Sequence, residues 1–170
     1  GATNDFKDEI GLEIEVEGVN LPNRIPSYWA VHLDGSLRNG GLEYVLAKPI
    51  ARKNVLKFLQ YLKKRIDDSG AEVVTSPRTS VHVHLNAKDQ TILEVYNNLV
   101  LYIIFEDALT HYAGPTRVGN LFCLRAKDAE FFVKRLVECA EGDQYQRLWD
   151  EHHLRYTAVN ICALQKFNSL

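Results

Sequence analysis

The chain has 170 residues, 46% of them hydrophobic, and its 20 basic residues nearly balance its 22 acidic ones, for a net charge of -2. This length is sufficient for a sizeable core, and we expect a single domain over residues 1–170. The near-neutral charge excludes a general electrostatic attraction to nucleic acid or to an acidic membrane surface.

The cysteines and the hydropathy of the chain indicate its cellular compartment. Cys123, Cys139 and Cys162 are widely spaced and form no CxxC pair, so neither a disulfide framework nor a thiolate zinc site is expected. The most apolar run, residues 99–112, is too short to cross a bilayer, and the N-terminus does not resemble a signal peptide. We therefore expect a cytoplasmic protein with no membrane partner.

The first half of the chain predicts three strands and a helix. Residues 9–18 alternate apolar side chains with glutamates, and "YWAVHLD" and "LEYVLA" form two further strands joined by the turn "DGSLRNGG". After Pro49, apolar residues recur at helical spacing and predict an amphipathic helix that ends near "DDSG". That spacing is carried by Val55, Leu56, Phe58, Leu59, Leu62 and Ile66.

The second half begins with the strand "TSVHVHLNA" and is then mainly helical. Asp89 or Thr91 could cap a helix running to about His111, whose apolar residues surround it so completely that it should be largely buried. The loop "GPTRVGN", a helix over "KDAEFFVKRLVECAEG", a short helix over "QYQRLWDEHH" and a strand over "YTAVNICAL" follow. The expected fold is α+β, with an antiparallel sheet covered by helices on one face.

The uncovered face of this sheet carries the chemistry. His82 and His84 share one side of their strand, and Glu13, Glu15 and Glu17 share one side of theirs. Either pattern alone has an ordinary explanation, as a solvated surface or a packing accident. Together they supply the oxygen and nitrogen donors that suit Mg²⁺ or Mn²⁺, and a cation would relieve the repulsion between the glutamates.

The turn before the third strand adds polar groups beside this face. Its glycines need no more than a hairpin to explain them, but Asp34, Ser36 and Arg38 could contact a substrate, and Glu43 lies where the next strand begins. Four motifs in order, "GLEIEVEG", "DGSLRNGGLEYV", "TSVHVHLN" and "RYTAVN", resemble the amidoligase family, relatives of glutamine synthetase and glutamate-cysteine ligase. Many members of that family are encoded by phages or by microbial gene clusters.

The resemblance implies a glutamine-synthetase-like catalytic fold and a role for particular residues. Glu13, Glu15, Glu43 and His82 match metal ligands, and His84 would lie near the nucleotide phosphates. Asp34 and Arg155 are the candidate catalytic residues. Arg155 and Asn160 match a motif that contacts phosphate or substrate, and Arg117 and Asn120 are weaker candidates for the same task.

The implied reaction is amide formation. ATP would phosphorylate a carboxylate to an acyl phosphate, and an amine would then displace the phosphate, with Mg²⁺ or Mn²⁺ neutralising charge. The partners would be small-molecule or peptide carboxylates and amines, which the sequence does not identify.

The resemblance also implies a further strand with a glutamate and an arginine two residues apart, which is not present before Leu170. We expect a truncated form, although a second chain or a homo-oligomer could complete the sheet, and the 170-residue form could be inactive. Two other functions stay open: a metal-dependent hydrolase or nuclease on the same face, and a non-catalytic domain that binds a nucleotide or a protein.

Overall fold

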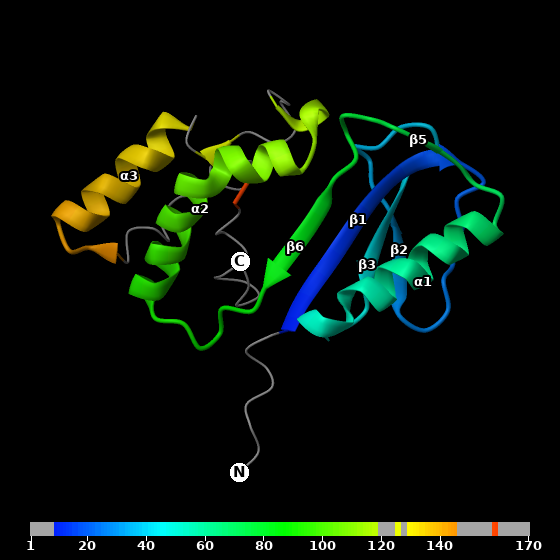
Figure 1. The fold of residues 1–170 in the computed structure, drawn as a ribbon, viewed down its shortest axis with the longest axis horizontal. Helices are drawn as coiled ribbons and strands as arrows, with labels where there is room; N and C mark the ends of the chain where they lie inside the picture. Colours follow the sequence, from blue (N-terminus) through cyan, green and yellow to red (C-terminus); the bar gives the residue numbers. More distant parts are fainter. Residues whose placement is uncertain (1–8, 119–124, 127–128, 146–157, 160–170) are drawn as a thin grey trace, which may run out of the picture. The chain divides into compact units, whose positions relative to one another are not determined.

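The computed structural model describes residues 9–118, 125–126, 129–145 and 158–159, and the chain divides into two compact units, residues 1–86 and 87–170 (Figure 1). Each unit has its own hydrophobic cluster. The expectation of a single domain stays a prediction.

The first unit is built on an antiparallel sheet. Its long strand β1 (Glu9–Val19) pairs with four others, and the strand order is β2-β3-β1-β4, with β5 and β6 also paired to β1. The other strands are β2 (Trp29–Leu33), β3 (Leu42–Leu46), β4 (Ile50–Ala51), β5 (Glu72–Val74) and β6 (Val81–Leu85). All the pairings are antiparallel, which confirms the predicted sheet, whereas β4 and β5 were not predicted.

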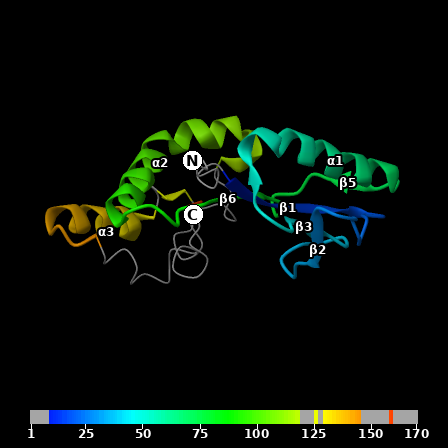
Figure 2. The ribbon, with the colours of Figure 1, turned by 90° about the horizontal axis from the view of Figure 1, so that it is seen from below.

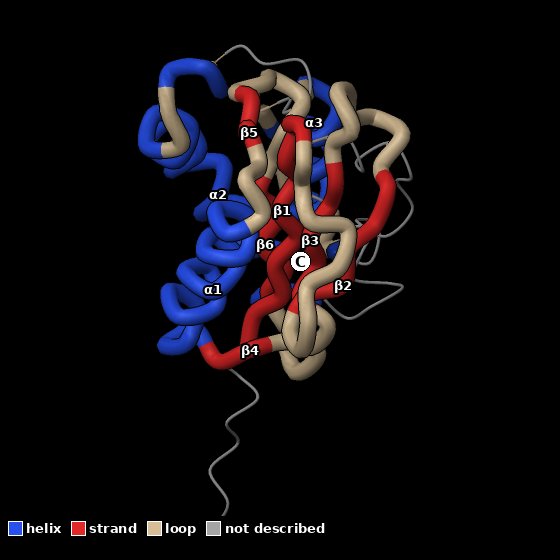
Figure 3. Tube along the Cα trace, turned by 90° about the vertical axis from the view of Figure 1, so that its right-hand side faces the viewer, coloured by secondary structure: helices blue, strands red, loops and turns tan. Residues whose placement is uncertain are grey.

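A helix covers the apolar face of this sheet. After the short 3-10 turn η2 (Arg52–Asn54), α1 (Val55–Asp68) runs along the sheet, as Figures 2 and 3 show. Leu62 of α1 is buried with Leu12, Tyr44 and Leu46 of the strands. Burying such side chains contributes about 1.5–3 kcal/mol each, so the predicted amphipathic helix is confirmed and holds the sheet from one side.

The second unit contains α2 (Ile92–Tyr112), the 3-10 turn η3 (Pro115–Arg117) and α3 (Glu130–Glu141). Thr91, one of the two predicted caps, begins α2: its side chain accepts from the backbone N–H of Glu94, and the Glu94 side chain accepts from the backbone N–H of Thr91. Both predicted helices are confirmed.

The prediction that α2 is largely buried is wrong. Only Val95, Leu99 and Glu106 of α2 are buried, and Leu101, Ile104 and Phe105 are each more than half exposed. The reason is that the cluster of this unit occupies one side of the helix, where Val95 and Leu99 pack with Phe132, Leu136 and Cys139. The apolar residues on the other sides of α2 raise the hydropathy of the helix but are exposed.

Two predicted elements cannot be compared with the structure. The short helix over residues 144–153 and the strand over residues 156–164 lie mostly outside the described residues. The glutamine-synthetase-like fold stays an implication of the resemblance. Among the described helices, none has the length and apolar character that crossing a bilayer requires.

Candidate active site

The register of three strands brings the predicted residues together on the face of the sheet opposite α1. Glu15 of β1 lies directly opposite Glu43 of β3, and Glu13 of β1 lies directly opposite His82 of β6. Residues paired in this way point to the same side, and adjacent strands are only about 4.8 Å apart. Strand pairing therefore places four donor side chains next to one another.

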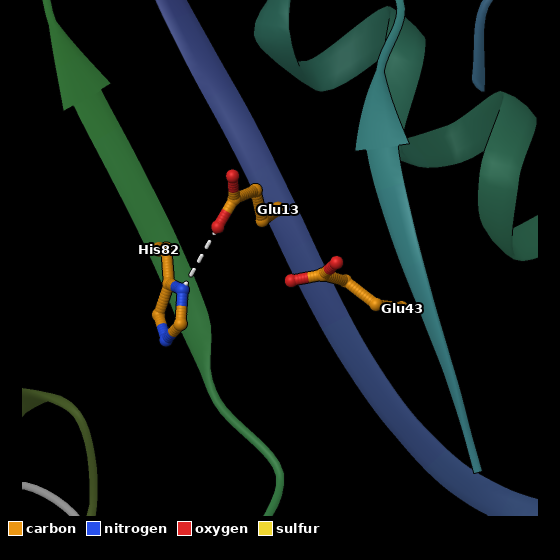
Figure 4. Close-up of side chains that lie close together, drawn as sticks. All are labelled: Glu13, Glu43 and His82. Atoms are coloured by element: carbon orange, nitrogen blue, oxygen red, sulfur yellow. Dashed lines mark hydrogen bonds and ion pairs between the residues drawn. The ribbon is translucent and has the colours of Figure 1, made fainter. Parts of the chain in front are cut away.

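These side chains form two groups of potential metal ligands. One group is Glu13, Glu43 and His82, and the other is Glu15, Asp34 and Glu43; within each group one donor atom per residue lies within 4.8 Å of the others. Figure 4 shows the first group, with its side chains converging from β1, β3 and β6. Glu43 belongs to both groups, and Asp34 reaches the second group from the turn after β2. Their roles as metal or catalytic residues stay predictions.

Glu13 lies between the two histidines. Its Oε2 is 3.0 Å from His82 Nδ1, and its Oε1 is 3.1 Å from His84 Nε2, a short contact that lacks hydrogen-bond geometry. The contacts with His82 and then His84 lower the pKa of Glu13 to about 2. The hydrogen bond to Glu13 in turn raises the pKa of His82, so the pair favours a carboxylate beside an imidazolium.

Ser80 links His82 to Glu15 and was missed in the sequence. Its hydroxyl donates to Glu15 Oε2 at 2.6 Å and lies 2.7 Å from His82 Nε2. A hydroxyl has one proton, so while it donates to Glu15 it accepts from His82. The available signal was position, because residues 80, 82 and 84 alternate onto one face.

Asp34 is held by its own turn. Its Oδ1 accepts from the backbone N–H of Ser36 at 2.7 Å, and this bond lowers the pKa of the Asp34 carboxyl group. The same turn is contacted by Arg78, whose Nη1 donates to the backbone oxygen of Ser36 at 3.3 Å. Asp34 is therefore an ionised carboxylate on a loop that is held by hydrogen bonds within the turn and from Arg78.

Glu43 has the opposite electrostatic environment. Burial raises the pKa of Glu43 first, and the negative charges of Glu13, Asp34 and Glu15 raise it further. This is the pattern expected of crowded carboxylates without a cation between them. His32 of β2 lies directly opposite Glu43 on this face and was also missed, although it alternates with the residues of its strand.

The remaining predicted residues lie in the second half of the chain. Arg117 lies in η3 of the second unit. Asn120, Arg155 and Asn160 lie outside the described residues.

Comparison with known proteins supports the resemblance. The model of a family described as "Putative amidoligase enzyme" matches residues 41–165, a range that contains Glu43, His82 and His84. Glu13, Glu15 and Asp34 precede that range, and strand pairing and the turn after β2 connect them to it. Searches among curated proteins and among solved structures found no match. Because the matched range covers most of the chain, the protein belongs to the family of amidoligase enzymes, which suggests a ligase.

Proposed function

We propose that the protein is an ATP- and divalent-metal-dependent carboxylate-amine ligase that acts through an acyl phosphate. The observation that carries the proposal is the pair of three-donor groups that share Glu43 on one sheet face, in a chain that belongs to the amidoligase family. Two cation sites beside each other suit phosphoryl transfer, in which charge neutralisation and positioning do most of the work.

The donor sets fit Mg²⁺ or Mn²⁺. The group of Glu15, Asp34 and Glu43 offers only carboxylate oxygens, and the group of Glu13, Glu43 and His82 adds one imidazole nitrogen. The raised pKa of Glu43 marks a concentration of negative charge that a bound cation would compensate. Bound ions would supply the positive charge that neutralises the phosphates.

The reaction assigns distinct tasks to the side chains. The substrate carboxylate oxygen attacks the terminal phosphorus of ATP and ADP leaves; the amine nitrogen then attacks the acyl carbon and phosphate leaves. The departing phosphate takes up the proton that the amine loses. Asp34, ionised and held by the backbone N–H of Ser36, would be a catalytic residue by holding a cation together with Glu15 and Glu43. By the family resemblance, His84, Arg117, Arg155 and Asn160 contact phosphate or substrate.

The test traps the acyl phosphate. The full chain is incubated with MgATP, a panel of amino-acid and peptide carboxylates, and hydroxylamine, and hydroxamate and ADP are measured. We expect equal amounts of both products with at least one carboxylate, and a loss of about a hundredfold or more in Glu43→Gln, because this change removes a ligand from both groups. Glu72→Gln, on an exposed position of β5, is the matched control and should behave as wild type.

Two results would replace the proposal with another function. Phosphate release that needs metal but neither carboxylate nor amine would indicate a metal-dependent hydrolase. Binding of MgATP without turnover under any condition would indicate a non-catalytic nucleotide-binding domain.

A further inference from the structure

Glu17 differs from the glutamates that precede it on β1. Alternation puts it on the same side of the strand as Glu13 and Glu15, yet its exposed fraction is 2%, and among the described residues only it and Glu106 are charged and buried. Its Oε1 accepts the backbone N–H of Arg38 at 2.7 Å. A buried carboxylate engaged by the backbone is directed into the protein and not toward a solvent-facing cation.

The bond holds the loop of residues 34–41 against β1. Within this loop Leu37 is buried, and Asn39 and Gly40 have φ values of 52° and 69°. A Cβ at Gly41 would lie 2.7 Å from Leu37 Cβ and 3.1 Å from Glu17 Cγ. The loop therefore packs directly on the Glu17 side chain. Hydrogen bonds from backbone N–H groups to charged acceptors are among the stronger ones.

The two donor groups depend on this loop to different extents. Asp34, the first residue of the loop, belongs to the group with Glu15 and Glu43. The other group consists of Glu13, Glu43 and His82, all of which lie on paired strands. A shift of the loop would move Asp34 and leave Glu13, Glu43 and His82 in place.

We propose that Glu17 is a positioning residue that fixes the loop of residues 34–41 and thereby places Asp34 in the donor group of Glu15 and Glu43. Glu17 itself is not a ligand. The inference rests on the proposed function, because it takes the two donor groups as cation sites. It explains why a third glutamate follows two that face the candidate active site.

The experiment is a titration of the full chain with Mn²⁺, read by the electron paramagnetic resonance of free Mn²⁺. Wild type is expected to bind two ions. Glu17→Ala should keep one site and weaken the other by about tenfold or more, as removal of a supporting partner of a metal ligand does. Glu17→Gln keeps an oxygen acceptor for Arg38 N–H, and we expect it to retain both sites.

Asp34→Asn shows whether the affected site is the one assigned. It should weaken the same single site, and the double variant with Glu17→Ala should lose no more than the larger of the two single losses, because both changes act on one ligand. Gly41→Ala would place a Cβ 2.7 Å from Leu37 Cβ and 3.1 Å from Glu17 Cγ, so it disturbs the packing of the loop and should weaken the same single site. It tests the dependence of that site on the loop if Glu17→Ala does not fold.

The outcomes separate the inference from the function on which it rests. Two unchanged sites in Glu17→Ala or in Gly41→Ala, or an equal loss at both sites, would overturn the role of Glu17 and leave the proposed function intact. Failure of wild type to bind Mn²⁺ would overturn the proposed function itself.

Discussion

Glu43 is the residue at which the electrostatics of the candidate active site converge. It lies opposite Glu15 and within reach of Glu13, Asp34 and His82, and its pKa is raised by burial and by its acidic neighbours. A carboxyl group with a folded-state pKa above its unfolded value loses its proton first in the unfolded chain. Its contribution to stability therefore falls as the pH rises from the unfolded pKa through the folded one.

Glu43→Gln tests this sign. In the presence of EDTA, the variant should exceed wild type in free energy of unfolding at pH 7.5, by under about 1 kcal/mol because the site is partly solvated. At pH 4, where the wild-type side chain is largely protonated, the gain should disappear. Urea unfolding at both pH values measures it, and an equal gain at both would contradict the electrostatic explanation.

At the scale of elements, β1 has two different faces, one packed against α1 and one that carries the candidate metal ligands. One face of β1 packs under α1 through Leu12, and the other presents Glu13 and Glu15. Because the side-chain period of a strand is two, a register shift of one residue would exchange these faces. Packing of α1 thus keeps the glutamates on the outer face.

A matched pair of leucines on α1 measures the contribution of this packing. Leu62 is 3% exposed and Leu56 is 66% exposed, on the same helix. Leu62→Ala should lower the free energy of unfolding by about 2–5 kcal/mol, because it leaves a cavity in the core. Leu56→Ala should change it by less than about 0.5 kcal/mol. Similar losses in urea unfolding would show that α1 is not packed as described.

For the whole molecule, cation binding should increase the free energy of unfolding. A ligand that binds only the folded state stabilises it by about 2.7 kcal/mol at a concentration of 100 times its dissociation constant. Saturating Mn²⁺ should therefore raise the melting temperature of the full chain, and EDTA should reverse the shift. Glu72→Gln should keep the shift and Glu43→Gln should lose most of it; an unchanged wild-type melting temperature would argue against cation binding.

Sequence patterns predicted the longer helices and strands. They missed very short strands, the burial of individual side chains, and contacts between residues far apart in the sequence. The alternation in β1 and β6 and the helical spacing in α1 were strong signals, whereas β4 and β5 have two and three residues, too few to show a period. Alternation assigned Glu17 to a face but could not reveal its burial, which depends on a loop 21 residues away. For the same reason the contacts of Ser80 with Glu15 and His82 became visible only when β6 was paired with β1.

The shared position of Glu43 makes the two proposed cation sites thermodynamically dependent. An ion in either group would fix the Glu43 carboxylate and lower the ordering cost at the other, while adding a neighbouring positive charge. Whichever effect is larger sets the sign of a coupling free energy, and reciprocity requires each ion to change the affinity of the other by the same factor. Cation binding by the protein would then follow a curve that is not the sum of two independent sites.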